Sequence, residues 1–216
     1  MDTKVKTDRA TSETQAEDEK KRGGKGYLRI KRLFDVVVAL VTGTVLLIPM
    51  LIIGLLVKLD SKGPAIFRQE RLGLHGKPFT MYKFRSMRLD AEENGPQWAN
   101  KNDERCTKLG KLLRKSRLDE LPQVVNILLG HMSIVGPRPE RAYFYDEFEA
   151  YIPGFRQRLQ VQPGLTGYAQ VNGGYDLSPE EKLAYDMEYI EKRCIRLDIS
   201  CMIKTVRLIF THEGAR

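Results

Sequence analysis

The chain has 216 residues, a formal net charge of +8 at pH 7, three cysteines and three histidines. This length suffices for one domain with a buried core, alone or together with a membrane segment and a tail. The excess positive charge indicates an anionic partner: a nucleic acid, an acidic membrane surface or a phosphorylated small molecule. The spacing of the cysteines and histidines matches neither a disulfide framework nor a zinc-type ligand set, so we expect reduced thiols and no transition-metal site.

The N-terminal part divides into a polar tail and an apolar run. Residues 1–26 combine mixed charge with almost no large apolar side chain, which predicts a disordered tail. Residues 36–57 carry no charge, and a straight helix of that length would measure roughly 33 Å, enough to cross a bilayer core. Pro49 removes a backbone donor and clashes with the preceding turn. We therefore expect a break that leaves residues 36–48 and 50–57 as separate pieces, each too short to cross.

Cations flank the apolar run on both sides, with Lys31 and Arg32 before it and Lys58 and Lys62 after it. Because cations beside membrane segments prefer the cytoplasmic face, this pattern favours a re-entrant helix over residues 27–60 that enters and leaves the membrane on one side. A kinked helix that crosses the bilayer remains the alternative, since transmembrane helices tolerate proline.

The next stretch, AIFRQERLGLHGKPFTMYKFRSM, predicts two strands around the turn GLHGKP. The two-residue period of a strand places Lys83 and Arg85 on one face, about 7 Å apart, where together they could hold a diphosphate. Charges that protect an edge strand from aggregation are an equally good interpretation of this pair.

A polar segment with a Gly-Pro break, residues 88–104, predicts a mobile loop. The following RCTKLGKLLRKS predicts a basic helix with Leu109, Leu112 and Leu113 as its apolar stripe. Such a helix lies either on an anionic membrane surface or on a solvated face of the protein.

Two adjacent carboxylates, Asp119 and Glu120, precede the helical pattern ELPQVVNILLG, which Gly130 ends. We expect Asp119 to be the N-cap and Glu120 to lie in the first turn, where Pro122 is tolerated. In one interpretation the acids only cap the helix and complement its dipole.

The cations around this acid pair support a second interpretation. Arg114 and Arg117 lie just before it and Arg138 lies beyond the helix, in VGPRPE. Guanidinium groups that converge on a carboxylate pair suit phosphate chemistry, so we expect all three to bind a phosphorylated substrate. One carboxylate would then attack or bind, while the other handles a proton or a divalent metal.

The C-terminal third predicts a glycine-rich loop, QPGLTGYAQVNGG, and then two helices. The first helix starts with Ser178 as N-cap, Pro179 at the first position and Glu181 completing a capping box. Asp186 falls within its apolar stripe, a position that by pattern favours a structural role. In the second helix, over residues 198–210, core packing is the first interpretation and contact with a membrane surface the second. Its apolar stripe consists of Ile199, Met202, Ile203, Val206, Ile209 and Phe210.

Four stretches in this order resemble the bacterial sugar transferases that act on polyprenyl phosphate, the monotopic phosphoglycosyl transferases. They are KRLFDVVVAL, GPAIFRQERLGLHGKPFTMYKFRSM, SRLDELPQVVNILLGHMSIVGPRPE and QPGLTGYAQVNG, and the resemblance runs from about Ile30 to about Phe210. Together with the patterns above it implies an α+β, mainly helical protein. We expect a re-entrant membrane helix and a compact cytosolic catalytic domain over residues 61–216, with a small β-hairpin and amphipathic interface helices.

The resemblance also implies an activity. Such enzymes move a sugar 1-phosphate from a UDP-sugar to undecaprenyl phosphate, release UMP and require Mg²⁺. They work at the cytosolic face of the bacterial cytoplasmic membrane, in the first membrane step of surface glycan synthesis. The charge also permits a membrane-anchored basic module without catalysis. Because no helix-turn-helix, RNP or zinc pattern is present, we expect no nucleic-acid partner.

The resemblance assigns roles to particular residues. Asp119 matches the nucleophile that forms a phosphosugar-aspartyl intermediate, and Glu120 matches its acidic partner; both are candidates for holding Mg²⁺. Pro49 matches the proline that bends the re-entrant helix, although Ile48 stands where relatives often have serine. The positions tied to substrate or metal binding are Lys83, Arg114, Arg138 and Asp186.

Overall fold

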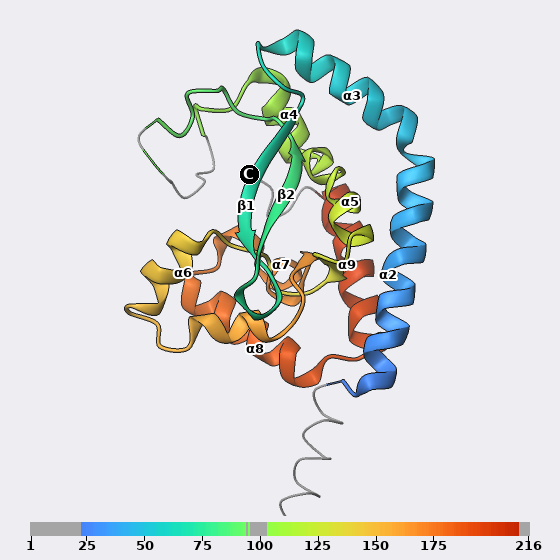
Figure 1. Ribbon diagram of the computed structural model, residues 1–216, viewed down its shortest axis with the longest axis vertical. Helices are drawn as coiled ribbons and strands as arrows, with labels where there is room; N and C mark the ends of the chain where they lie inside the picture. Colours follow the sequence, from blue (N-terminus) through green and yellow to red (C-terminus); the bar gives the residue numbers. More distant parts are fainter. Residues whose placement is uncertain (1–22, 94, 96–102, 212–216) are drawn as a thin grey trace, which may run out of the picture.

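Two helices form a bent pair along one edge of the molecule (Figure 1). They are α2, Lys25–Val45, and α3, Leu47–Asp60. The computed structural model describes residues 23–93, 95 and 103–211, so most of the expected tail lies outside the described residues. Among those residues no single helix is long and apolar enough to cross a membrane. The two helices together meet that requirement by length and composition, with a bend of 63° between them.

The bend lies at Leu46, upstream of Pro49, so the predicted division into 36–48 and 50–57 was wrong in position. Pro49 is the third residue of α3, where a missing N–H costs no intrahelical bond. Its ring would clash with the carbonyl four residues earlier, that of Val45, if the helix were continuous. The first helix accordingly ends at Val45, and Pro49 bends the chain through the residues before it.

Polar contacts fasten α2 to the rest of the protein. The carboxylate of Asp198 accepts hydrogen bonds from Tyr27 Oη (2.8 Å), Lys31 Nζ (2.9 Å) and Tyr189 Oη (2.7 Å). Arg32 donates to the carbonyl oxygens of Ile127 and Leu128, at the end of a neighbouring helix. The cations that the sequence presents as flanking a membrane segment therefore bind inside the protein at this end.

The predicted hairpin is confirmed. Strand β1, Ile66–Leu72, pairs antiparallel with β2, Pro78–Phe84, through the 3₁₀ turn η1, Leu74–Gly76. Phe79 and Met81 point from β2 into the main core, and Lys83 follows them at the same two-residue period. β2 thus runs from the core to the end of the hairpin, where it positions Lys83.

The predicted basic helix is α4, Lys108–Lys115, and the Thr107 hydroxyl caps it by accepting a hydrogen bond from Gly110 N (2.9 Å). Leu113 is buried, whereas Leu112 is 61% exposed, so only part of the expected apolar stripe packs on the protein. The polar segment before α4 forms turns over residues 88–93, and most of the predicted loop beyond lies outside the described part of the chain.

Gly110 lets α4 pack directly against the backbone that follows the hairpin, because a Cβ at this position would lie only 1.9 Å from Ser86 O. We expect Gly110→Ala to lower the free energy of unfolding by about 1–3 kcal/mol, the usual cost of overpacking. Gly26→Ala is the matched control: Gly26 lies in α2 with nothing within 4 Å of an added Cβ, and alanine favours helix. Thermal unfolding of both variants tests this, and equal melting temperatures would contradict it.

A second, parallel pair of short strands joins β3, Ser133–Val135, to β4, Gly164–Thr166. The glycine-rich stretch predicted as a loop thus contains β4 and the helix α7, Tyr168–Asn172, so that prediction was wrong. Its glycines allow close backbone approach: a Cβ on Gly164 would lie 2.1 Å from Gly136 N. Glycine serves strand pairing here rather than an open loop.

The remaining elements include α5, Gln123–Leu128, α6, Ala142–Glu149, α8, Pro179–Lys192, and α9, Ile195–Thr211. The predicted capping box at the start of α8 is confirmed, since Ser178 and Glu181 exchange both hydrogen bonds. The prediction of a mainly helical chain with a small hairpin is also confirmed.

The apolar stripe of α9 was expected to pack into the core, but much of it faces outward. Asp198 and Cys201 are buried, and Thr205 bonds Thr166 of β4, whereas Ile203 is 66% exposed. The helix therefore turns its mixed polar face inward and leaves much of its apolar stripe uncovered. The exposed members of that stripe are Ile199, Ile203, Val206 and Ile209.

Candidate active site

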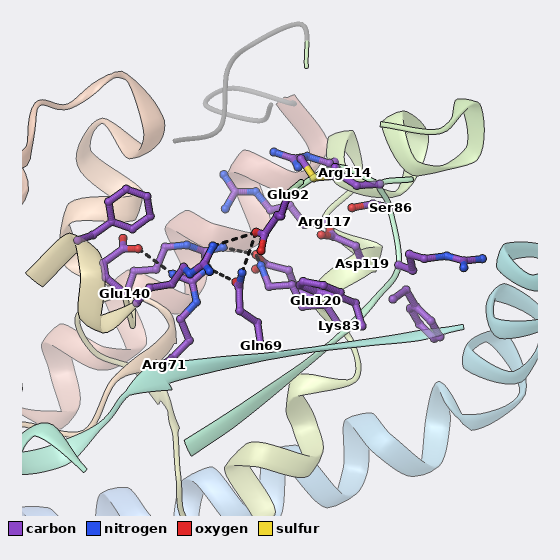
Figure 2. Close-up of a pocket in the computed structure, with 18 of the residues that line it drawn as sticks. Gln69, Arg71, Lys83, Ser86, Glu92, Arg114, Arg117, Asp119, Glu120 and Glu140 are labelled. Atoms are coloured by element: carbon purple, nitrogen blue, oxygen red, sulfur yellow. Dashed lines mark hydrogen bonds and ion pairs between the residues drawn. The ribbon is translucent and has the colours of Figure 1, made fainter. Parts of the chain in front are cut away.

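A cavity of about 340 Å³ opens beside the end of β2, the segment between α4 and α5, and the start of α8 (Figure 2). Asp119 and Glu120 both line it. Among the described residues, eleven Lys and Arg side chains and five Asp and Glu side chains line the cavity, so its charge suits an anionic ligand. The cations are Arg71, Lys83, Arg85, Arg88, Arg105, Arg114, Arg117, Arg138, Arg141, Arg158 and Lys182.

The acid pair lies in a 3₁₀ turn, η2, Leu118–Glu120, which precedes α5. Arg117 starts this turn in the left-handed region, with φ 58°, and α5 begins only after Pro122, with no side chain capping it. The prediction of Asp119 as N-cap and Glu120 in the first helical turn was therefore wrong. Freed from capping, the Asp119 side chain lines the cavity while remaining only 7% exposed.

Glu120 is held by two cations from distant parts of the chain. Its Oε1 accepts hydrogen bonds from Lys83 Nζ on β2 (3.1 Å) and from Arg138 Nη2 after β3 (2.5 Å). Burial by itself would raise the pKa of Glu120. The charges and hydrogen bonds of Arg138 and Lys83 outweigh it and hold this pKa well below its ordinary value, so Glu120 stays ionised.

The pKa of Asp119 shifts in the opposite direction, although Asp119 immediately precedes Glu120. Burial raises the pKa of Asp119 to about 6, the Glu120 charge adds to the rise, and Lys83, Arg114 and Arg138 oppose it. At neutral pH this carboxyl is mostly ionised but poorly solvated. Such a carboxylate is more basic than an exposed one and is suited to act as a nucleophile or to bind a metal ion.

The structure brings Lys83, Arg114, Arg117 and Arg138 to the cavity of the acid pair, as the second interpretation of the sequence requires. Arg85 also lies at this cavity, but its guanidinium donates to carbonyl oxygens at the end of α3, including Ser61 O (2.6 Å) and Val57 O (3.2 Å). Arg85 therefore fastens the end of α3 while it also lines the cavity with Lys83, and joint binding of a diphosphate by the two cations stays a prediction.

Asp186 lines the cavity, as its assignment from the resemblance requires, and pairs with Arg158, which the sequence patterns did not indicate. Arg158 Nε donates to Asp186 Oδ2 at 2.7 Å, and each side chain is 1% exposed. No local motif distinguishes Arg158 from Arg156, which pairs with Asp146 at the surface. The available signal was Asp186 itself, because a carboxylate in an apolar stripe requires a buried partner.

The sequence patterns also did not indicate a network of hydrogen bonds and ion pairs that runs along the cavity from Glu140 to Glu92 (Figure 2). Arg71 Nη1 donates to Glu140 Oε2 (3.0 Å), and Arg71 Nη2 donates to Gln69 Oε1 (2.6 Å). Glu92 Oε1 accepts from Gln69 Nε2 (3.1 Å) and Arg141 Nη1 (2.9 Å). These contacts connect β1 with the turns after β2 and with the start of α6.

The chemistry of the acid pair also fits a hard divalent cation. Mg²⁺ is commonly held by one or two carboxylates together with substrate phosphates and water. Within the described ranges, no three His, Cys, Asp or Glu side chains lie close enough to form a complete ligand set. Asp119 and Glu120 could therefore supply part of a Mg²⁺ shell, with phosphate oxygens of a bound substrate supplying the rest.

Residues 26–212 match the family of bacterial sugar transferases, and the chain belongs to this family. The resemblance in the sequence motifs is thereby confirmed. A relative from Aeromonas hydrophila, a UDP-N-acetylgalactosamine-undecaprenyl-phosphate N-acetylgalactosaminephosphotransferase, is 42% identical over 193 residues, covering 88% of this chain and 46% of the relative.

Two further relatives differ in length. The UDP-glucose:undecaprenyl-phosphate glucose-1-phosphate transferase of Escherichia coli K12 is 41% identical over 192 residues, 86% of this chain and 41% of the relative. The exopolysaccharide production protein PSS of Rhizobium leguminosarum bv. phaseoli is 40% identical over 191 residues, 83% of this chain and 94% of the relative. The chain thus spans less than half of the first two relatives and most of the third.

Proposed function

We propose that this protein transfers a sugar 1-phosphate from a UDP-sugar to undecaprenyl phosphate and releases UMP, as the first membrane step in making a surface glycan. The observation that carries this proposal is the Asp119 carboxylate, with its raised pKa, on the wall of a cavity rich in guanidinium and ammonium groups. The names of the Aeromonas and E. coli relatives support the lipid acceptor, and the name of the Rhizobium relative supports a role in exopolysaccharide synthesis.

In the proposed first step, a carboxylate oxygen of Asp119 attacks the β-phosphorus of the UDP-sugar. A bond from oxygen to phosphorus forms, and the phosphoanhydride bond breaks, so that UMP leaves with its electron pair. The sugar phosphate remains on Asp119. In the second step a phosphate oxygen of the lipid attacks the same phosphorus and restores the Asp119 carboxylate, so two substrates use one cavity in succession.

Attack of a carboxylate on a diphosphate must overcome repulsion between anions. Arg114 and Arg117 supply positive charge at the cavity wall for the phosphate oxygens, while Glu120 orients Lys83 and Arg138 beside Asp119. Asp119 and Glu120 are the residues that would hold Mg²⁺ against the phosphates. When bound, this ion supplies further neutralisation of phosphate charge.

A panel of UDP-sugars tests the reaction. Purified protein with Mg²⁺ and undecaprenyl phosphate is expected to release UMP from at least one of UDP-glucose, UDP-galactose, UDP-GlcNAc and UDP-GalNAc, and a chelator is expected to stop the release. No UMP from any of them, together with tight salt-sensitive DNA binding, would instead support a basic binding module.

We also propose that α2 and α3 dip into the cytoplasmic membrane from the cytosolic face. The bend of 63° and the exposed apolar side chains along both helices support this, including Val41 (59% exposed) and Leu59 (75% exposed). Such a surface is costly in water and stable in lipid.

Cysteine labelling separates the two topologies. With a single cysteine placed in the N-terminal tail or at Lys62, we expect an impermeant thiol reagent added to spheroplasts, which lack an outer membrane, to leave both unlabelled. It should label both after the cells are lysed, because both ends of a re-entrant segment face the cytosol. Labelling of one position but not the other in spheroplasts would show a helix that crosses the membrane.

A further inference from the structure

The Asp186–Arg158 ion pair lines the cavity of the acid pair and is almost completely buried. Both side chains are 1% exposed, and the Arg158 guanidinium lies over the rings of Phe155 (4.7 Å) and Tyr145 (5.9 Å). A buried ion pair generally stabilises a fold no more than apolar side chains of the same volume. Stability alone therefore does not explain why this pair lies at the wall of the cavity.

The second contact of Arg158 gives the pair a connection to the acid pair. Arg158 Nη2 donates to the backbone carbonyl of Arg138 (3.1 Å), and Arg138 Nη2 donates to Glu120 Oε1 (2.5 Å). Each link is a hydrogen bond with a charged donor, which is stronger and more directional than a neutral one. The series runs from Asp186 on α8, through Arg158 and Arg138, to the residue next to Asp119.

We propose that Asp186 and Arg158 are positioning residues that fix the backbone at Arg138, so that the Arg138 guanidinium meets Glu120 beside Asp119. This inference rests on the proposed function for its effect on turnover. It gives Asp186 a role in addition to the substrate or metal contact that the family resemblance implies, because its Oδ2 holds the Arg158 guanidinium at the cavity wall.

Arg158→Lys is the central test, since lysine keeps the charge but cannot bond Asp186 and the Arg138 carbonyl together. We expect kcat for UMP release to fall about 100-fold, the scale of a displacement of about 1 Å in a catalytic group, with KM changed much less. Asp186→Asn keeps an acceptor for Arg158 Nε and is expected to retain more activity than Asp186→Ala.

A double-mutant cycle distinguishes positioning from general loss of stability. Arg158→Lys combined with Arg138→Lys should cost little more than the worse single change, because both act through the contact with Glu120. Asp198→Asn is the matched control: it weakens a buried pair with Lys31 that does not line the cavity. Its effect should multiply with that of Arg138→Lys. If the Arg158 and Arg138 effects also multiply, the positioning role is refuted.

A crystal structure of Arg158→Lys tests the inference without activity. We expect Arg138 Nη2 to lie beyond hydrogen-bond distance of Glu120 Oε1 in the variant. An unchanged contact would overturn the inference even if the UDP-sugar assay succeeds. A lost contact would support it even if no UDP-sugar is a substrate, so the two proposals can fail separately.

Discussion

Replacement of Asp119 by asparagine is expected to abolish UMP release, with a loss in kcat on the order of 10⁴-fold or more, as for removal of other covalent nucleophiles. Asparagine has nearly the same shape, but its neutral amide is a poor nucleophile and cannot form a stable acyl phosphate. Because the two side chains have nearly the same shape and Asp119 lines the cavity, the change should leave the fold intact. Steady-state UMP release and thermal unfolding measure the two effects.

The covalent route also predicts an exchange reaction without the lipid acceptor, and Asp119→Asn should abolish that exchange. With the lipid acceptor left out, the unmodified protein should exchange labelled UMP into UDP-sugar, because the first step is reversible. Asp146→Asn serves as the control, since Asp146 pairs with Arg156 at the surface and does not line the cavity. Near-normal turnover of Asp119→Asn, or absence of exchange in the unmodified protein, would argue for direct transfer between the two substrates.

The second large effect concerns stability. Asp186→Ala leaves the Arg158 guanidinium buried without its carboxylate, and such a change typically costs about 3–5 kcal/mol of the free energy of unfolding. Glu188→Gln on the same helix is the control, since Glu188 pairs with Lys192 in the solvent-exposed i,i+4 geometry. Exposed pairs contribute about 0.3–0.5 kcal/mol. Denaturant unfolding compares the two, and equal midpoints would contradict the expectation.

A double substitution tests separately whether the ion pair stabilises the fold and whether it positions Arg138. Arg158→Met with Asp186→Leu replaces the pair by apolar side chains of similar size, which in other buried pairs restores or exceeds the original stability. We expect the doubly substituted protein to unfold near the unmodified midpoint but to remain slow in UMP release, because the Arg138 carbonyl still lacks its donor. Full activity in this variant would mean that the pair serves the fold alone.

Several local features of the fold follow from short-range chemistry and were predictable. The hairpin around GLHGKP and the capping box at Ser178 depend on residues only a few positions apart, so their patterns are complete within the local sequence. The break in the apolar run is also local, but its position at Leu46 depends on a clash four residues before Pro49.

Features that depend on distant contacts were mistaken or missed. Arg85 shares the two-residue period of Lys83, yet it binds the end of α3, which a strand pattern does not report. The glycines of the second sheet read as loop residues because their partner strand lies near residue 134. Arg158 has no motif, since its role depends on Asp186 and on the Arg138 backbone.

The order of residues along the chain determined the bent apolar segment, the hairpin, the family and the acid pair set among cations, because each depends on composition or on neighbours within a few turns. Only the tertiary structure decided which charges meet. Lys83 and Arg138 are far from Glu120 in sequence, yet together they keep it ionised, while burial makes the adjacent Asp119 the more basic carboxylate. The physical reason is that charge interaction and desolvation depend on distance and burial in space, which spacing along the chain does not specify.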